Sequence, residues 1–409
     1  MSATVVCIGT RREVPDGAVA CPDCGGAVGF AFDLDDVHFD DGDTSMWRYR
    51  RLLPLPDGAD PVSLGEGRTP LTRASRRDAF GGADVRWKNE TLNPSGSHKD
   101  RALSVAVSVA TGRGASTVFV ASAGSTGLAA AAYAARAGLR CVVVVGADAP
   151  EGRLLPLRIA GAHVVRVGSS VDDALDRLGE LARTHGLVDL STRRSGNPWQ
   201  AEGPKTIAYE IVESLETAPD VVVIPIGGGG TIAGIARGFE ELREMGRIER
   251  VPRLVGTQPA GYETLVTAIT DGLTTEDELR AAAFTDRPPT VQVKTAHTFA
   301  PDGAEALAAI RATDGTVLAV TDAEALAGCL DLAQQDGIWA EPSSGVVVPA
   351  IARLVADGMI GPNDLVVGLI CGNGFRELPA LESGLADQLP PIETLPADPT
   401  DRLLALAAS

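Results

Sequence analysis

The chain contains 409 residues, a length that accommodates two domains of ordinary size around well-buried cores. Its net charge is −18, so a nucleic-acid partner or an anionic membrane surface is not expected. No apolar run reaches the ~18 residues that span a bilayer, and the N-terminus lacks the pattern of a secretory signal. We therefore expect a cytoplasmic α/β protein.

The first forty residues predict short strands joined by tight turns, and they contain Cys7, Cys21 and Cys24. This order is typical of a zinc ribbon, which uses two C-x₂-C pairs. The first pair is incomplete, because Thr10 follows Cys7 where the second cysteine is required, and His38 completes the set only if the fold brings it near. We interpret residues 1–45 as a degenerate zinc-ribbon-like segment that holds no metal, with the three cysteines as candidate ligands.

From about residue 100 the sequence alternates between amphipathic helices and buried strands. Helices are predicted at 100–114, 122–138, 151–162, 171–185, 203–217 and from 231 onward. Strands are predicted at 116–122, 139–146, 163–168, 187–191 and 221–226. Continuous β-branched strands between helices imply parallel sheets covered on both faces, which is a doubly wound architecture. The tail at 390–409 is predicted to be a proline-rich linker with at most one short helix.

A glycine loop follows the strand that ends at Ile226, and it consists of Gly227, Gly228, Gly229 and Gly230. Backbone amides at the start of the following helix, near Thr231, bind an anion and usually a phosphate. A Walker A loop is excluded because no Gly-Lys-Ser/Thr closes the stretch. The loop matches the glycine pattern of dinucleotide-binding proteins only in part. A nucleotide-dependent oxidoreductase therefore stays open as an alternative.

Lys99 is one of only four lysines among 36 basic residues, the others being Lys88, Lys205 and Lys294. Lysine, unlike arginine, can lose its proton and become a nucleophilic amine. Lys99 lies in the stretch NPSGSHKDR, where a turn opens a helix whose positive end disfavours an ammonium group. Together with a distant phosphate cradle, such an amine indicates pyridoxal 5′-phosphate as the cofactor.

This stretch resembles the N-P-[ST]-G-S-[FH]-K-D-R motif of the threonine synthase family, in the fold type II group of pyridoxal-phosphate enzymes. The resemblance extends from the N-terminal cysteines through SLGEGRTPLTRA (63–74) to CGNGF (371–375). It implies two doubly wound domains with mainly parallel sheets. The implied large cofactor-binding domain is formed by 46–99 and 196–385, the small domain is 100–195, and the tail is 386–409. It also implies a homodimer with a small amino-acid substrate.

The resemblance assigns roles residue by residue. Lys99 holds the cofactor as a Schiff base and acts in proton transfers, and Gly227 to Gly230 with Thr231 bind the phosphate. The substrate α-carboxylate is received by Ser122, Ala123, Gly124, Ser125 and Thr126. Ser125 replaces the asparagine that in relatives contacts the cofactor ring oxygen, and helix capping by Ser125 or Thr126 is an alternative role.

Residues from three further segments extend the implied site. Cys371 lies at the pyridine nitrogen, where cysteine is more typical of serine/threonine dehydratases, or is a small core residue. Glu341 and Ser343 line the cofactor site, with a helix N-cap as the alternative role of Ser343. Gln200 stands where the family has an arginine that grips the substrate phosphate, and Arg193 and Arg194 just upstream are candidate substitutes.

The resemblance thus implies a lyase that converts O-phospho-L-homoserine to L-threonine and phosphate. Three alternatives stay open beside the oxidoreductase. They are a serine/threonine ammonia-lyase, a β-replacement enzyme acting on an activated serine, and a cofactor-binding protein without turnover.

Overall fold

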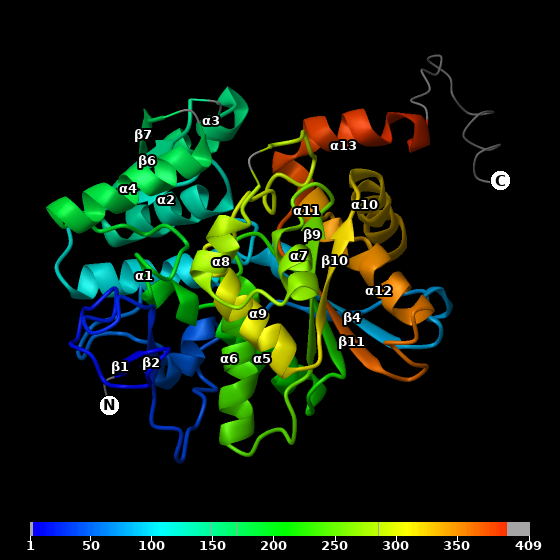
Figure 1. The fold of residues 1–409 in the computed structure, drawn as a ribbon, viewed down its shortest axis with the longest axis horizontal. Coiled ribbons are helices and arrows are strands. Elements are labelled where there is room, and N and C mark those ends of the chain that lie inside the picture. The colour runs from blue at the N-terminus through cyan, green and yellow to red at the C-terminus, as the bar shows by residue number, and fades with distance from the viewer. Residues whose placement is uncertain (1–2, 148, 169, 285, 391–409) are drawn as a thin grey trace.

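The computed structural model of the chain describes residues 3–147, 149–168, 170–284 and 286–390. The strands are β1 (Thr4–Cys7), β2 (Val28–Ala31), β3 (Leu71–Arg73), β4 (Asp84–Asn89), β5 (Thr117–Ala121), β6 (Arg140–Val145), β7 (His163–Arg166), β8 (Val221–Pro225), β9 (Arg253–Pro259), β10 (Thr316–Val320) and β11 (Leu365–Ile370). They form three sheets, with the orders β1-β2, β5-β6-β7 and β10-β9-β8-β11-β4-β3 (Figure 1). In the two larger sheets every pair is parallel except β3 with β4. The predicted architecture is therefore confirmed.

The six-stranded sheet is buried on both faces because its strands are nearly continuous in β-branched residues. In β8, Val222 and Ile224 belong to one apolar cluster, whereas Val221 and Val223 belong to another. The first cluster is covered by α5 (Lys205–Leu215), α6 (Gly230–Glu244), α7 (Thr264–Asp271), α8 (Glu276–Ala281) and α9 (Gly303–Ala312). The second is covered by α10 (Asp322–Asp336), α11 (Pro342–Gly345) and α12 (Val347–Ala356). Alternation along each strand thus supplies both cores.

The three-stranded sheet packs against α1 (Lys99–Gly112), α2 (Ser125–Ala137), α3 (Glu151–Ile159) and α4 (Val171–His185). Alanines of α2 such as Ala129 and Ala130 are fully buried, which lets α1 and α2 approach closely. The prediction of a full strand at 187–191 is wrong. Only Asp189 forms a bridge to β5, held by hydrogen bonds between Phe119 and the neighbouring residues Val188 and Leu190, at 2.9 and 2.7 Å.

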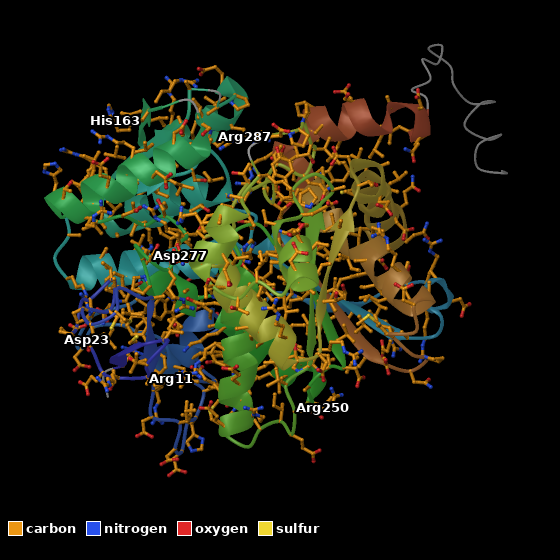
Figure 2. All side chains as sticks on the ribbon, in the orientation of Figure 1. Arg11, Asp23, His163, Arg250, Asp277 and Arg287 are labelled. Carbon is orange, nitrogen blue, oxygen red and sulfur yellow. The ribbon has the colours of Figure 1, made fainter. Side chains whose placement is uncertain are left out.

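The remaining elements are short. They are the 3₁₀ helices η1 (Met46–Leu52), η2 (Arg77–Phe80), η3 (Glu90–Leu92), η4 (Trp199–Glu202), η5 (Gly374–Arg376) and η6 (Ala386–Gln388), and helix α13 (Leu378–Leu385). Charged side chains such as Arg250 and Asp277 lie on the outside (Figure 2). Among the described residues no helix is long and apolar enough to cross a bilayer. The short helix considered for the tail, beyond residue 390, lies outside the described residues.

A buried ionic network ties the first turn of α1 to the large sheet. The guanidinium of Arg101, fully buried, donates to Glu90 at 2.7 Å and to Glu210 at 2.6 Å. Glu210 also accepts from Lys88 of β4 at 2.6 Å. These groups are desolvated, so each depends on its partners for charge compensation.

We expect Arg101→Ala to lower the free energy of unfolding by about 3–5 kcal/mol, because two buried carboxylates lose their counter-ion. Arg177→Ala is the matched control. Arg177 is half-exposed and pairs with Glu180 at the surface, so its loss changes stability by less than about 1 kcal/mol. Urea denaturation of the cofactor-free proteins measures both. Equal midpoints for the two variants would contradict this account of the network.

Candidate active site

The candidate site lies at the carboxyl ends of three neighbouring strands, β4, β11 and β8. The turn at 93–98 follows β4 and η3, Cys371 follows β11, and the glycine loop follows β8. In open parallel sheets this edge is where ligands bind. The topology therefore brings together three segments that are more than a hundred residues apart in sequence.

The turn before Lys99 is fixed by direct contact with the segment after β11. Gly96 has φ +84°, and a Cβ there would overlap the side-chain amide of Asn373. The backbone amide of Asn373 donates to the Gly96 carbonyl at 3.0 Å, and the backbone amide of His98 donates to the Cys371 carbonyl at 2.8 Å. Only glycine permits this approach, so Gly96 sets the position of the lysine.

His98 links the lysine turn to the start of α6, directly after the glycine loop. Its Nδ1 lies 3.2 Å from the Cys371 carbonyl, which only accepts, so Nδ1 carries the proton. Nε2 then accepts from the hydroxyl of Thr231, 3.2 Å away at the start of α6. Burial, with the charge of Lys99, lowers the pKa of His98 to about 3, so the ring stays neutral.

Lys99 is the first residue of α1 and is half-buried. Burial lowers the pKa of Lys99, while the nearby carboxyl groups of Asp302 and Glu341 act in the opposite direction. A lowered pKa increases the fraction of neutral amine, which is the form that attacks a carbonyl.

The glycine loop is crowded on one side by Asp302. A Cβ on Gly229 would lie 2.7 Å from the Asp302 carbonyl oxygen, and one on Gly230 would lie 2.5 Å from its carboxylate. Gly229 also has φ +96°, so glycine is required there for two reasons. The first amides of α6 have no carbonyl within their own helix to bind, which leaves them for an anion.

The loop at Ser122–Thr126 opens α2. Ser122 accepts from the Gly124 amide at 3.1 Å, and the helix N-cap is Gly124. The alternative in which Ser125 or Thr126 caps α2 is therefore wrong, because the turn of Ser122 already starts the helix. Instead, Ser125 accepts from Arg376 of η5 at 2.8 Å.

Two cations, Lys294 and Arg376, flank this loop. A Cβ on Gly124 would lie 3.4 Å from the Lys294 ammonium, which pairs with Glu377 at 2.8 Å. In Arg376, Nε and Nη1 are buried and without a hydrogen-bond partner among the described residues. The sequence interpretation missed both residues, although Lys294 is one of the four surviving lysines, and that scarcity is the signal that identifies it.

Around Cys371, serines of α11 hold the backbone. Ser344 accepts from the amides of Cys371 and Gly372 at 3.0 and 3.2 Å, while Ser343 accepts from the Lys294 amide at 3.1 Å. The N-cap of α11 is Glu341, so an N-cap role for Ser343 is wrong. Burial raises the pKa of Cys371, which keeps its thiol neutral.

Gln200, in η4, is 4% exposed, and its Nε2 has no hydrogen-bond partner among the described residues. The two candidate substitutes are engaged in ion pairs. Arg193 lies 3.5 Å from Asp189, and Arg194 pairs with Glu305 at 2.7 Å. Both arginines are thus charge-compensated without a ligand.

The three N-terminal cysteines do come together. The sulfur atoms of Cys7, Cys21 and Cys24 all lie within 4.8 Å of one another, and this group does not include His38, which is exposed. Hydrogen bonding to Thr10 lowers the pKa of Cys7 to about 6.

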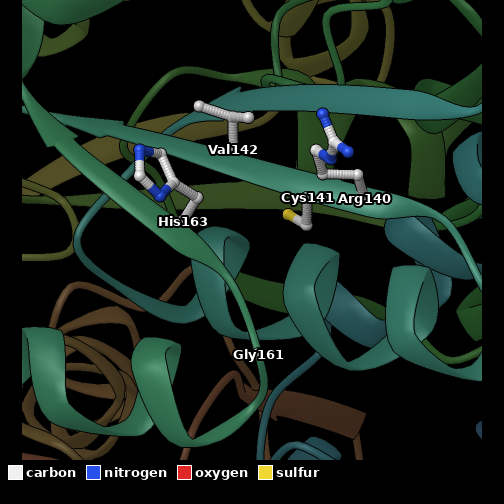
Figure 3. Close-up of a pocket in the computed structure, with 5 residues that line it drawn as sticks. All are labelled: Arg140, Cys141, Val142, Gly161 and His163. Carbon is white, nitrogen blue, oxygen red and sulfur yellow. The ribbon is translucent and has the colours of Figure 1, made fainter.

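Figure 3 shows a pocket elsewhere, lined by Arg140, Cys141, Val142, Gly161 and His163. These residues lie at the amino ends of β6 and β7, the end opposite to the ligand edge of a parallel sheet. The pocket therefore contributes nothing to the candidate site.

Pyridoxal phosphate fits the residues at the strand ends. The site offers an amine with a lowered pKa, a helix start whose glycines admit no side chain, and a neutral thiol. Lys99 would carry the aldehyde carbon, the glycine loop with Thr231 would hold the phosphate, and Cys371 would contact the ring.

The carboxyl group of Asp302 predicts a pH dependence of stability. Burial, with the charge of Glu305, raises the pKa of Asp302 from 3.8 to about 7, against the opposing effects of Arg194 and Lys99. Between these values the folded protein keeps a proton that the unfolded chain releases, so stability falls as pH rises from about 4 to 7. We expect Asp302→Asn to remove about 2–4 kcal/mol of this fall in the cofactor-free protein.

Chemical denaturation at a series of pH values measures this slope. Asp277→Asn, at an exposed position on α8, is the control and leaves the slope unchanged. A slope that survives in Asp302→Asn would show that other groups cause the dependence.

Comparison with known proteins identifies the family. Residues 62–372 match the family model described as pyridoxal-phosphate dependent enzyme. A threonine synthase of Mycobacterium tuberculosis is 33% identical over 356 residues, which cover 86% of this chain and 92% of the relative. A threonine synthase of Methanocaldococcus jannaschii is 32% identical over 383 residues, covering 90% and 91%.

The fold is also similar to that of a solved L-serine ammonia-lyase from Rhizomucor miehei. The TM-score is 0.66 at 21% identity, with 79% of this chain and 99% of the other covered. At this identity the likeness concerns the fold alone. On the family match and the sequence identities, the chain belongs to the pyridoxal-phosphate dependent enzymes.

Proposed function

We propose that the chain is a pyridoxal-phosphate-dependent lyase that converts O-phospho-L-homoserine and water to L-threonine and inorganic phosphate. The observation that carries this proposal is the hydrogen-bonded connection from the lysine turn through His98 to Thr231 at the phosphate loop. The proposal is supported by relatives of similar length that are named threonine synthase.

Bound pyridoxal phosphate supplies an electron sink for the negative charge that forms when the substrate Cα loses its proton. In this proposal Lys99 Nζ takes that proton and returns it later. Neutral His98 fixes the backbone around Lys99 without adding a competing charge. The neutral thiol of Cys371 leaves the ring nitrogen without an acidic partner.

The substrate is oriented by the start of α2. Amides of the Ser122–Thr126 loop receive the α-carboxylate, as helix N-termini receive anions. The cations Lys294 and Arg376 lie beside the same loop, and Arg376 keeps two unpaired donors. A substrate with a second anionic group satisfies these donors, and this favours phosphohomoserine over serine or threonine.

One observation favours a second candidate, a serine/threonine ammonia-lyase. Gln200 occupies the position of the expected phosphate-gripping arginine, and a glutamine carries no charge to bind a dianion. In this reading the cations hold the α-carboxylate only, and the products are ammonia and a 2-oxo acid.

The proposal also includes three further properties of the chain: it forms a homodimer, it is located in the cytoplasm, and it divides into two domains. Trp339 and Phe375, 40% and 67% exposed with ring centroids 5.7 Å apart, support association through an apolar surface. The six free cysteines support a reducing compartment. The position of β5, β6 and β7 within 100–195 supports the small domain at those residues.

Lys99→Ala and Lys99→Arg are both expected to yield colourless protein after reconstitution with pyridoxal phosphate, because neither supplies a neutral amine. The unaltered chain is expected to be yellow and to retain a pyridoxyl group on Lys99 after borohydride reduction. Absorbance and mass spectrometry measure the outcome. A yellow Lys99→Arg protein with reducible cofactor would refute the assignment of Lys99.

A substrate panel separates the two candidate functions. Phosphate release from O-phospho-L-homoserine with formation of threonine is expected. Release of a 2-oxo acid from serine or threonine at a higher kcat/KM would instead establish the ammonia-lyase.

Arg376→Gln is expected to lower kcat/KM for phosphohomoserine ~10- to 100-fold, chiefly through KM, because a charged hydrogen bond to the substrate is lost. Arg376→Lys should restore part of it. Arg250→Gln, at an exposed surface pair, is the control. If Arg376→Gln lowers kcat/KM for serine by the same factor, Arg376 does not bind the phosphate group of the substrate.

A further inference from the structure

The cluster of Cys7, Cys21 and Cys24 is not used by the catalytic proposal. The Cys7 and Cys24 sulfur atoms are 3.6 Å apart, and all three lie within 4.8 Å of one another. A disulfide requires about 2.05 Å. Zn–S bonds of about 2.3 Å in a tetrahedron separate the sulfur atoms by about 3.8 Å. The Cys7–Cys24 distance is close to this value, and the third sulfur atom lies near enough to join the same coordination sphere.

The backbone around the sulfur atoms forms two facing turns. The first follows β1, where the Thr10 amide approaches Cys7 Sγ at 3.5 Å and the Arg11 amide donates to the Cys7 carbonyl at 2.8 Å. The second is the Cys21–Cys24 turn, where the Gly25 amide donates to the Cys21 carbonyl at 2.8 Å. Thr10 thus lies three residues after Cys7 in the first turn, as Cys24 lies three residues after Cys21 in the second turn.

Exposure differs across the cluster. Cys7 and Cys21 are buried, whereas Thr10 and Cys24 are exposed. The side without a sulfur atom therefore faces solvent, where a water molecule can complete a tetrahedral set. Figure 2 labels Arg11 and Asp23, one from each turn, at the outer edge of the molecule.

The N-terminal lobe, residues 3–31, has little else to stabilise it. Its buried apolar core consists of Val5, Cys7, Val14, Cys21, Val28 and Phe30. Its two strands have four residues each, and an isolated hairpin of this size is marginal in water. Small folds of this kind are commonly stabilised by a structural metal.

We propose that Cys7, Cys21 and Cys24 bind one Zn²⁺ as thiolates, with water at the fourth position beside Thr10. The sequence predicted no metal because a fourth cysteine is missing. In the fold the three thiols converge and the fourth position faces solvent, so a water molecule can replace the missing ligand. The ion stabilises the lobe, which packs through Phe30 on Trp199 of η4, with ring centroids 6.5 Å apart. This inference does not depend on the catalytic proposal.

The first test is metal content and spectroscopy of the full-length protein with its cofactor. Purification without chelators is expected to give one zinc per chain. After zinc removal, Co²⁺ titration is expected to give a thiolate-to-cobalt charge-transfer band that saturates at one equivalent. Absence of both signals in the reduced protein would overturn the proposal.

Variants then assign the ligands. Cys24→Ser should lose the zinc and the cobalt band, whereas Cys141→Ser, a buried cysteine of the small sheet, should retain both. Thr10→Cys adds a fourth thiolate and should slow zinc release to a chelator at least tenfold. Pyridoxal-phosphate content should be equal in all three. Zinc retained in Cys24→Ser, or zinc release unchanged by Thr10→Cys, would contradict the assigned site.

Discussion

One buried ionic network governs the geometry of the whole site. In it, Arg101 lies between the carboxylates of Glu90 and Glu210. Arg101 lies two residues after Lys99 in the first turn of α1, and Lys88 of β4 completes the network. Because both carboxylates are buried, the helix start cannot move relative to β4 without a large electrostatic penalty. Lys99 is thereby fixed to the sheet that carries the glycine loop.

The four lysines of this arginine-biased chain share a property that extends the argument made for Lys99. Lys88 and Lys205 are fully buried in ion pairs with Glu210 and with Glu202 and Glu241, and Lys294 is 16% exposed beside Glu377. None is an ordinary surface lysine. Scarcity of the residue type therefore indicates a specific environment, of which catalysis is only one case.

Much of the fold could be predicted because its strands are continuous β-branched runs and its helices are periodic. The failure at 187–191 has a local cause, since among the described strands this segment pairs only with β5, through the single bridge at Asp189. In the site, the lysine turn and the glycine loop are visible in sequence because their chemistry is local. Arg376 and Asp302 are not, and Lys294 is marked only by the scarcity of lysine. Their importance arises from contacts with Gly124, Ser125 and Gly230 that only the folded chain creates.

The central position of β11 has a consequence for how the protein matures. This strand lies between β8 and β4, yet in chain order it is the last of the strands within the described residues. Until residues 365–373 are inserted, the Gly96 turn lacks Asn373, and His98 lacks its carbonyl acceptor. A chain truncated before β11 would therefore lack the contacts that hold the Lys99 turn in place.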